Sequence, residues 1–452
     1  MREVFRRPRG TQDILPDQVS RWRTVEEKFR HWCGLYGYWE VRTPAFESRA
    51  LFERTVGDAT DIVEKQMFRV GPPKADEGRP EQKEKEEWVL RPEGTAPVAR
   101  AVLENGLLSR QSLVKLFYVA AIFRYERPQA GRLRQHHQCG VEALGSGDPA
   151  LDAEVIDLGW NFLNDCHIEG LSVFLNSIGC LQPECRPRYR QDLLNYFWQK
   201  ESLLCKDCRR RLQSNPLRIL DCKEETCQPV ARKAPKSWEY LCPACQDHFS
   251  RLQDHLSGMG IPFEIDGHLV RGLDYYQRTV FEFRHMGLGA QNTILGGGRY
   301  DGLIEELGGP ATPGVGFGCG IERVLLAMVP TPNEQEQSAV IDVFVAPLTK
   351  AAQKEGVKLL SALRKKKIAA DMDYSEPKNP TGTEELRSLK GQMRQAHKRR
   401  ARLVIIIGDD ELTRNFLTVR DMVEHRQWTV AFGDAVAKIT AYILGQRDPS
   451  LR

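Results

Sequence analysis

The sequence has no apolar run long enough to cross a membrane. The longest apolar runs among its 452 residues, such as Leu403 to Ile407, have the length of a strand, and the N-terminal segment MREVFRRPRGTQDILP is charged. A transmembrane helix needs about 20 consecutive apolar residues, and a secretory signal needs an apolar stretch after its basic start. We therefore expect neither a membrane span nor a secretory signal, and we expect a globular protein of the cytoplasm.

Common nucleotide-binding fingerprints are also missing. There is no glycine-rich loop followed by lysine and serine or threonine, and no dinucleotide-binding pattern. If the protein binds a nucleotide, arginines must hold its phosphates. The net charge of +4 is too small to indicate a nucleic-acid partner by itself. However, basic runs at Arg364 to Lys367 and Lys398 to Arg402 leave an RNA partner open.

Isolated cysteines are few, because eight of the twelve occur as four close pairs. The pairs are Cys180 with Cys185, Cys205 with Cys208, Cys222 with Cys227, and Cys242 with Cys245. Without an export signal, such pairs are more typical of thiolate metal ligands than of disulfides. The two pairs with x2 spacing, at 205/208 and 242/245, together form a strong tetrathiolate zinc signature, and the other two form a weaker one. We predict at least one structural zinc, with reduced core cysteines as the alternative.

The first part of the chain predicts a helix, a short strand and a polar turn. Residues 17–38 place apolar side chains at spacings of three and four, and WEVRTP at Trp39 to Pro44 alternates like a strand. The charged segment Gly71 to Glu87 predicts a hairpin tip. In WVLRPEGT, Glu93 and Thr95 point the same way and suit an ammonium group, although capping of a helix that starts near Pro97 is the alternative.

The densest polar pattern lies between Leu116 and Leu144. The segments AAIFRYERPQ and RLRQHHQCGVEALG predict two antiparallel strands, with a turn at Ala130 and Gly131. The side chains that these strands direct to one concave surface are Arg124, Glu126, Gln138 and Glu142. Arginine suits phosphate, because its planar fork binds two oxygens at once. A charged, exposed sheet face is the weaker alternative, since both strands are otherwise apolar.

The segment LVRGLDYY, Leu269 to Tyr276, places a cation, an anion and two phenols in an apolar run. A buried polar group without a partner costs roughly 1 to 3 kcal/mol, so these groups need partners. By itself the segment favours a structural ion pair between Arg271 and Asp274. Two glycine-rich motifs, GGGRYD at Gly296 to Asp301 and VGFGCGIER at Val315 to Arg323, predict strands whose backbone approaches a ligand closely.

With these motifs the chain resembles the bacterial-type histidyl-tRNA synthetases, which are class II aminoacyl-tRNA synthetases, over nearly its whole length. The matching segments are RPEGT, FRYERPQAGRLRQ, LVRGLDYY, GGGRYDGL and GIER. The resemblance implies an α+β fold: an antiparallel sheet flanked by helices, an inserted Cys-rich and mainly helical domain, and a C-terminal α/β anticodon-binding domain. We place the catalytic domain at 1–179 and 263–330, the insertion at 180–262, a linker at 331–340 and the anticodon-binding domain at 341–452.

The resemblance further implies formation of histidyl-adenylate and pyrophosphate from L-histidine and ATP with Mg²⁺. Histidine is then transferred to the 3′ end of tRNA(His) by a homodimer. The implied catalytic residues are Arg124 and Arg271 at the α-phosphate and Arg323 at the γ-phosphate end. For ATP, the resemblance adds Glu126 at the adenine or its metal-bound phosphates, and His136, where the family usually has an aromatic residue against adenine.

The residues implied to bind histidine fall into two groups. Glu93, Gly94, Thr95 and Gln138 match the grip on the α-amino group, and Glu142 and Tyr276 match the imidazole contacts, with Tyr275 beside them. With the phosphate arginines near LVRGLDYY, Arg271 is better interpreted as reaching toward substrate. We expect Asp274 to hold Arg271 or a neighbouring backbone group.

Two alternatives share this fold. The regulatory subunit of ATP phosphoribosyltransferase resembles a synthetase but does not aminoacylate; it typically lacks the C-terminal domain and loses parts of LVRGLDYY and the phosphate arginines, all of which this chain keeps. A pseudo-synthetase that senses RNA would be expected to carry additional regulatory domains.

Overall fold

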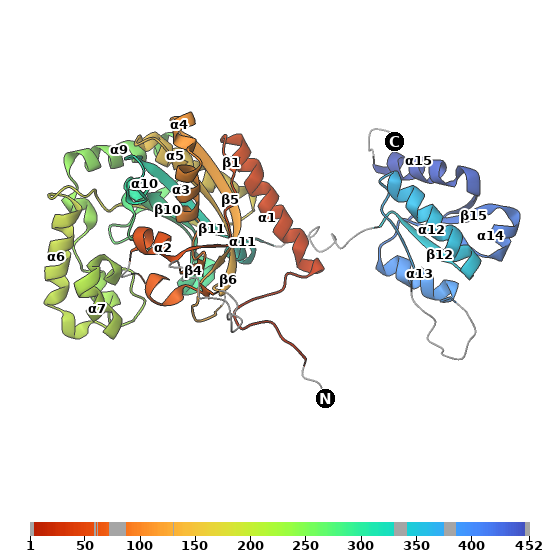
Figure 1. Ribbon diagram of the computed structural model, residues 1–452, viewed down its shortest axis with the longest axis horizontal. Helices are drawn as coiled ribbons and strands as arrows, with labels where there is room; N and C mark the ends of the chain where they lie inside the picture. Colours follow the sequence, from red (N-terminus) through yellow and green to blue (C-terminus); the bar gives the residue numbers. More distant parts are fainter. Residues whose placement is uncertain are drawn as a thin grey trace, which may run out of the picture. The chain divides into compact units, whose positions relative to one another are not determined.

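The computed structural model describes residues 4–57, 60, 62–71, 87–129, 131–329, 341–374 and 386–447. The chain divides into two compact units, Met1–Thr331 and Pro332–Arg452, which are described separately (Figure 1). The predicted linker at 331–340, residues 72–86 of the predicted hairpin tip, and Ala130 of the predicted turn lie outside the described residues.

An eight-stranded sheet forms the centre of the first unit, with the order β1-β5-β6-β11-β10-β9-β7-β8. In that order the strands are Trp39–Glu40, Val114–Phe123, Gln135–Leu144, Gly314–Gly320, Thr293–Arg299, Gln277–His285, Leu171–Ser177 and Phe263–Ile265. All inner pairs are antiparallel, while β1 pairs with β5, and β7 with β8, in parallel. The predicted antiparallel sheet is confirmed, and the predicted strand at 39–44 is reduced to two residues.

Helices cover one face of this sheet. The helices α1 (Pro16–Leu35), α5 (Pro149–Asp165), α9 (Pro243–Gly258) and α11 (Ile321–Ala327) share a core with the strands. The helix α1 forms because apolar residues recur every three or four positions, from Trp22 to Cys33, all of them buried. It begins at a proline, which suits the first turn because that turn needs no backbone donor. The helix predicted at 17–38 is thus confirmed, ending at Leu35.

Smaller elements surround the opposite face. One of them is a three-stranded sheet with the order β2 (Phe46–Ser48), β4 (Trp88–Leu90) and β3 (Arg69–Val70). The others are the helices α2 (Arg49–Val56), η1 (Ile62–Gln66), α3 (Thr95–Glu104), α4 (Leu107–Arg110) and α10 (Leu303–Glu306). Between β9 and β10 lies η5 (Met286–Gln291). The guanidinium of Arg91 ties these elements together, because it donates to the backbone oxygens of Ala121, Thr43 and Pro44.

Residues 180–262 are all described and form helices and turns, as predicted (Figure 1). The elements are α6 (Arg186–Trp198), η2 (Glu201–Leu203), α7 (Lys206–Ser214), η3 (Pro216–Ile219), α8 (Gln228–Ala231), η4 (Ser237–Tyr240) and α9. The apolar side chains of α6, α7, η3 and α8 join those of β5 and the 269–276 segment in a second core. The insertion therefore packs directly against the LVRGLDYY segment.

The second unit is a five-stranded α/β domain with the order β13-β12-β14-β15-β16. These strands are Ala370–Met372, Val343–Pro347, Leu403–Ile407, Phe416–Asp421 and Gln427–Ala431. Its helices are α12 (Lys350–Lys365), α13 (Leu389–Lys398), α14 (Asp409–Arg414), η7 (Phe432–Asp434) and α15 (Ala435–Arg447). The basic helix expected from Glu384 to Arg400 is observed as α13, and residues 384 and 385 lie outside the described residues.

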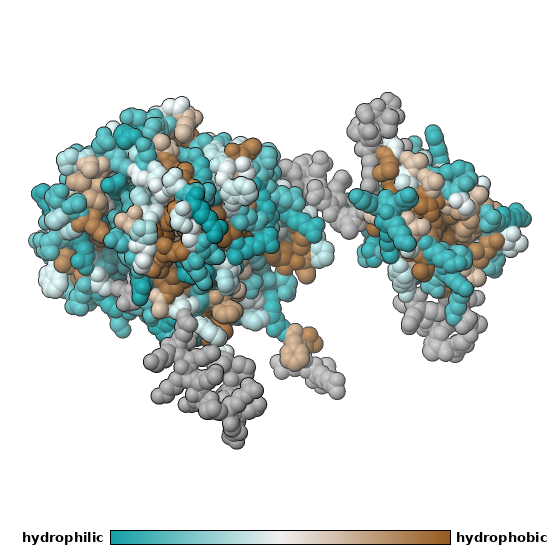
Figure 2. Space-filling model, turned by 45° about the horizontal axis from the view of Figure 1, so that its top comes forward, coloured by the Kyte–Doolittle hydropathy of each residue, from teal (hydrophilic) through white to brown (hydrophobic). Residues whose placement is uncertain are grey.

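The surface facing the viewer in Figure 2 is mainly hydrophilic on both units, and apolar residues gather there in small patches. Among the described residues, none of the helices combines the length and the apolar character required to span a membrane.

Candidate active site

Glycines form the floor on which the predicted substrate-binding side chains lie. Gly316 lies beneath Glu142, Gly318 beneath Gln138, Gly296 beneath Arg271 and Gly298 beneath Tyr276. A Cβ on Gly316 would lie 2.3 Å from a carboxylate oxygen of Glu142, and one on Gly296 would lie 2.4 Å from the guanidinium of Arg271. Any larger residue at these positions would displace a site residue. These glycines let the chain's own side chains approach the backbone closely, whereas the predicted close approach of a ligand stays a prediction.

The carboxyl group of Glu142 is the centre of a buried polar cluster. Its side chain is 1% exposed and accepts hydrogen bonds from the hydroxyl of Thr95, at 2.7 Å, and from that of Tyr300. Burial raises the pKa of Glu142 to about 8, and the two hydroxyls oppose this only in part. A buried carboxyl group that can gain or lose a proton near neutrality suits recognition of an imidazole, which titrates in the same range.

Two buried phenols beside Glu142 keep unused hydrogen-bonding capacity. The hydroxyls of Tyr118 and Tyr275 make no hydrogen bond within the described part of the chain. The rings of Tyr275 and Tyr276 lie 4.7 Å apart between centroids, and both side chains are buried. Because buried polar groups normally have partners, these hydroxyls are available to a polar ligand.

Glu93 caps a helix in this structure. Its two carboxylate oxygens accept the backbone N–H groups of Thr95, at 2.7 Å, and of Ala96, at 2.8 Å, at the start of α3. This is the capping arrangement that the sequence left open as an alternative. Burial raises the pKa of Glu93, while the two backbone donors and Arg124 act in the opposite direction. The contact between Glu93 and an ammonium group stays a prediction.

Arg271 pairs with Glu282 on β9, not with Asp274. Glu282 also accepts from Arg284, at 2.8 Å, and from the hydroxyl of Thr293, at 3.0 Å. The Nε atom of Arg271 has no hydrogen-bond partner among the described residues. The guanidinium is thus held by Glu282 through Nη1, and its Nε atom keeps a free donor.

The expectation for Asp274 was wrong. Its carboxylate accepts from the side-chain amide of Asn215, at 2.7 Å, which belongs to the insertion. The backbone N–H of Asp274 donates to the carbonyl of Val56, at 3.2 Å. Asp274 therefore faces the insertion, and the bend at Gly272 and Leu273 lies between it and Arg271.

Arg124 and Arg323, two of the three arginines predicted to bind phosphates, lie near Arg132, which was not predicted. Burial lowers the pKa of Arg323, and the like charges of Arg132 and Arg124 lower it further. Arg124 donates to the backbone oxygen of Pro92, at 2.7 Å, and Arg323 to that of Gly131, at 3.2 Å. Like charges held together by backbone contacts are stabilised by an anion.

The two remaining predicted ATP residues lie beside these arginines. Glu126 pairs with Arg132 at 3.4 Å. Burial lowers the pKa of His136 to about 3, with smaller contributions from Arg124 and Arg323, so the ring is neutral. A neutral, flat ring next to cations can stack against a purine without adding charge.

Family models and known relatives agree on one family. The model described as "Histidyl-tRNA synthetase" matches residues 10–324, and that described as "Anticodon binding domain" matches residues 342–442. The chain is 49% identical over 436 residues to the histidine--tRNA ligase of Desulforudis audaxviator, covering 96% of this chain and 98% of that one. It is 49% identical over 414 residues to the same enzyme of Moorella thermoacetica, covering 92% and 93%.

The solved structure of apo S. aureus histidyl-tRNA synthetase has a TM-score of 0.74 and 34% sequence identity, covering 97% of this chain and all of that one. The chain belongs to the histidyl-tRNA synthetase family. This confirms the resemblance inferred from the motifs, together with the predicted C-terminal domain.

In this family member, the eight paired cysteines form two clusters whose pairing differs from the prediction. The proximal cluster contains Cys180, Cys185, Cys242 and Cys245, and the distal cluster contains Cys205, Cys208, Cys222 and Cys227. The predicted combination of 205/208 with 242/245 was therefore wrong, as was that of 180/185 with 222/227. The prediction combined pairs that have the same spacing. In the structure, each pair separated by two residues lies beside a pair separated by four residues, because the fold brings these two pairs together.

The clusters have the geometry of metal-binding thiolates. The four ligand atoms of each cluster lie within 4.8 Å of one another, and the twelve cysteines are free. The sulfurs of Cys180 and Cys242 are 3.7 Å apart, and those of Cys205 and Cys222 are 3.9 Å apart. A tetrahedral site with a zinc–sulfur distance of about 2.3 Å requires sulfurs about 3.8 Å apart. The donor sets therefore fit zinc and do not fit disulfides, whose sulfurs lie at about 2.0 Å.

Several site residues were not singled out from the sequence. Tyr300 is inside the quoted motif GGGRYD, and Arg132 inside FRYERPQAGRLRQ, so these motifs were the signal. Glu282 and Asn215 had no local signal, because their roles depend on segments distant in sequence.

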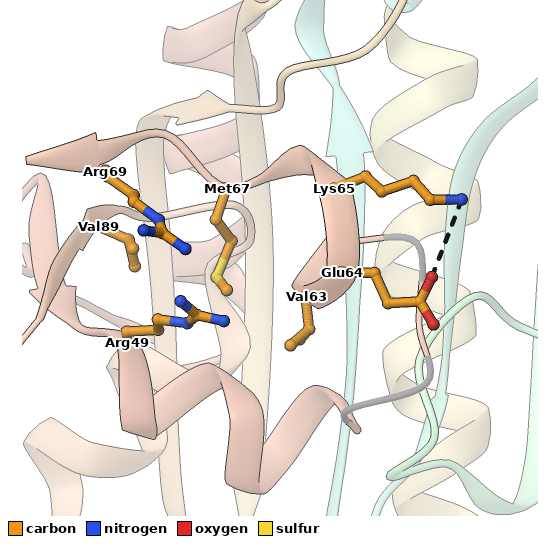
Figure 3. Close-up of a pocket in the computed structure, with 7 residues that line it drawn as sticks. All are labelled: Arg49, Val63, Glu64, Lys65, Met67, Arg69 and Val89. Carbon is orange, nitrogen blue, oxygen red and sulfur yellow. Dashed lines mark ion pairs between the residues drawn. The ribbon is translucent and has the colours of Figure 1, made fainter.

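A separate cavity of about 200 Å³ lies between α2, η1 and β4 (Figure 3). Its lining residues are Arg49, Val63, Glu64, Lys65, Met67, Arg69 and Val89. None of the predicted site residues lines it, so this cavity is distinct from the cluster around Glu142.

Proposed function

We propose that this protein activates L-histidine with ATP to histidyl-adenylate and pyrophosphate, and then transfers histidine to the 3′ end of tRNA(His). The observation that carries the proposal is a buried, titratable Glu142, with phenols that lack partners among the described residues, on the same sheet face as Arg271 and near Arg124 and Arg323. Membership of the family supports the same reaction.

Histidine is recognised by the buried polar cluster. Glu142 and Tyr276 bind the imidazole, with Tyr275 beside them, and Gln138, Thr95, Gly94 and Glu93 surround the α-amino group. When histidine binds, Glu93 gives up part of its hydrogen bonding to the first N–H groups of α3 and accepts from the ammonium group. A buried pocket that hydrogen-bonds a substrate group rejects analogues that lack the group by a factor of about 10⁴ or more, because its own polar atoms would lose their partners.

The arginines bind ATP and stabilise the transition state. Arg124 and Arg271 hold the α-phosphate oxygens on which negative charge develops when the histidine carboxylate attacks phosphorus, and Arg323 holds the γ-phosphate end. His136 stacks on adenine. Fixed cations aimed at developing charge lower the barrier without reorganisation during the reaction.

Mg²⁺ accompanies ATP, and Glu126 offers it a carboxylate oxygen, the hard ligand that this ion prefers. When bound, the ion neutralises phosphate charge. Glu126 lies beside Arg132, at 3.4 Å, so a metal-bound phosphate and an arginine can share this position.

The second unit binds the tRNA anticodon arm through the basic residues of α12 and α13. The reaction takes place in the cytoplasm, where tRNA is charged. The functional assembly is a homodimer that associates through α1 and β1. In its support, β1 is an edge strand, and Leu35 and Trp39 at this edge are 62% and 75% exposed.

Each cysteine cluster holds one structural zinc ion. Metal binding at such a site contributes about 10 kcal/mol or more to local folding. Metal analysis of the purified full-length protein should find about two zinc ions per chain, and each quadruple set of cysteine-to-serine changes should remove one. Less than about one zinc per chain would refute both sites.

The decisive experiment for the reaction is histidine-dependent exchange of pyrophosphate into ATP. Exchange with histidine, and with no other amino acid, is expected. A regulatory subunit that only has the catalytic fold would bind histidine without exchange, so absence of exchange in protein that binds histidine would favour that alternative. A pseudo-synthetase would also fail to exchange.

A further inference from the structure

The insertion grips the Arg271–Tyr276 loop from outside the substrate pocket. The side-chain amide of Asn215 donates to the carboxylate of Asp274 at 2.7 Å, and Arg218 donates to the backbone oxygen of Arg271 at 3.4 Å. Arg186 donates to the backbone oxygen of Tyr276 at 2.6 Å. Three contacts thus hold the beginning, the middle and the end of the loop that carries Arg271 and Tyr276.

These three residues are tied to the cysteine clusters by the chain itself. Arg186 directly follows Cys185 of the proximal cluster. Asn215 and Arg218 lie between Cys208 and Cys222 of the distal cluster, which closes the intervening segment into a loop. Closing a loop removes conformational freedom from the residues inside it. A bound metal at either cluster therefore restricts the residues that contact the Arg271–Tyr276 loop.

The contact surface is closely fitted. A Cβ on Gly272 would lie 2.9 Å from a nitrogen of Arg218, and one on Gly57 would lie 2.5 Å from an oxygen of Asp274. Gly57 has φ of 94°, so a side chain there would also strain the backbone. The Asp274 turn is thus held between Arg218 of the insertion and Gly57 of the catalytic domain.

Electrostatics favour the same docking. Burial raises the pKa of Asp274, whereas Arg218, Arg186 and the amide of Asn215 act to lower it. The groups that compensate this buried carboxyl thus come from the insertion. On another side, Arg210 of α7 pairs with Glu64 of η1 at 3.4 Å, which continues the contact between the insertion and the catalytic domain.

We propose that the two cysteine clusters, when loaded with metal, position the Arg271–Tyr276 loop for histidine through Asn215, Arg218 and Arg186. These three are positioning residues: they act through the loop and do not touch substrate. The proposal rests on the proposed histidine site, and it makes histidine affinity dependent on the metal content of the insertion. Loss or oxidation of the cysteine ligands would then reduce histidine activation without altering a substrate contact.

The test swaps the two side chains of the Asn215–Asp274 hydrogen bond in the full-length protein. N215D places two carboxylates against each other, and the double variant N215D/D274N restores an amide–carboxylate pair with the roles reversed. A hydrogen bond to a charged group contributes about 1.5–3 kcal/mol, so N215D should raise the KM for histidine at least about tenfold in pyrophosphate exchange. The KM for ATP should rise less than that for histidine, because Arg124 and Arg323 lie outside the loop and still hold the nucleotide. The double variant should recover most of the loss.

Arg232→Ala is the matched control, because the side chain of this exposed arginine of the insertion bonds to Gln228 alone among the residues that the structure describes. It should leave both KM values unchanged. An unchanged histidine KM in N215D would overturn the proposal, as would a double variant that recovers nothing. Zinc content, measured in each variant, should stay at the wild-type level, which separates lost contact from lost metal.

Metal removal is the second measurement. Wild-type protein treated with a chelator and returned to exchange assays should show a raised histidine KM, reversed by added Zn²⁺. Metal-free protein with an unaltered histidine KM would overturn the coupling. If untreated wild-type protein fails to exchange pyrophosphate with histidine at all, it is the proposed function that fails, and calorimetric histidine binding to the same variants still tests the coupling.

Discussion

Histidine binding should take up protons at alkaline pH because of Glu142. Burial places the pKa of this carboxyl group at about 8 in the free protein. The raised pKa means that the group keeps its proton up to neutral pH and loses it as the pH rises through about 8. Since burial disfavours net charge, the complex of Glu142 with an imidazole should hold one shared proton and no net charge.

The magnitude follows from the fraction of ionised Glu142. That fraction is about 0.1 at pH 7 and about 0.75 at pH 8.5 for a pKa of about 8. When histidine binds, Glu142 should therefore take up about 0.1 proton at pH 7 and about 0.75 proton at pH 8.5. The matching loss of affinity at pH 8.5 is about fourfold relative to the value at lower pH.

Calorimetry in buffers with different ionisation enthalpies measures this uptake directly. Titration of histidine's own groups adds to the signal, but it adds equally in Glu142→Gln, which cannot ionise at this position. The difference between wild type and E142Q should thus rise from near zero at pH 7 to most of a proton at pH 8.5. Equal uptake by the two proteins at pH 8.5 would refute the role of Glu142 as the titrating partner of the imidazole.

Three further predictions concern Gly316 beneath Glu142, the proposed catalytic residue Arg271, and the buried ion pair between Arg299 and Asp152. Gly316→Ala, whose Cβ would meet Glu142 at 2.3 Å, should lower kcat/KM for histidine at least about tenfold in pyrophosphate exchange. Gly258→Ala, with open space around its Cβ, should not. Arg271→Ala should reduce pyrophosphate exchange about 10²–10³-fold while calorimetric histidine binding changes little, and an unchanged exchange rate would remove Arg271 from the mechanism. Arg299→Met removes the arginine that pairs with buried Asp152 and leaves His248, at 3.8 Å, as its neighbour. It should lower the free energy of unfolding by about 3–5 kcal/mol in denaturant titration, whereas a change within error would show that the pair is dispensable.

Local patterns predicted much of the fold. The helix α1, the strands β5 and β6, and the passage from β11 into α11 follow from periodicity, turn residues and glycines near each other in sequence. Residue types at the site were also readable, since a buried arginine or carboxyl group in an apolar strand needs a partner or a ligand. What could not be read was which partner each group takes.

The cysteines illustrate the limit. Spacing identified all eight cysteines of the two clusters, because a knuckle of two close cysteines is a local structure. Spacing also suggested the wrong combination, because the partner of each knuckle is decided by where α6, α7 and α9 begin in space. The same reason separates Arg271 from Asp274: the pairing of β9 with β10 brings Glu282 to Arg271, and the docking of the insertion brings Asn215 to Asp274.

The sequence by itself thus determined the family, the strands that carry the site, and the chemical groups available for histidine, ATP and metal. Only the tertiary structure decided that Glu142 meets Tyr300, that glycines lie beneath the site's own side chains, and that the cysteine-rich insertion holds the Arg271–Tyr276 loop. The physical reason is that residue types and short spacings fix local conformation and chemistry, whereas these contacts join segments that only sheet register and domain packing bring together.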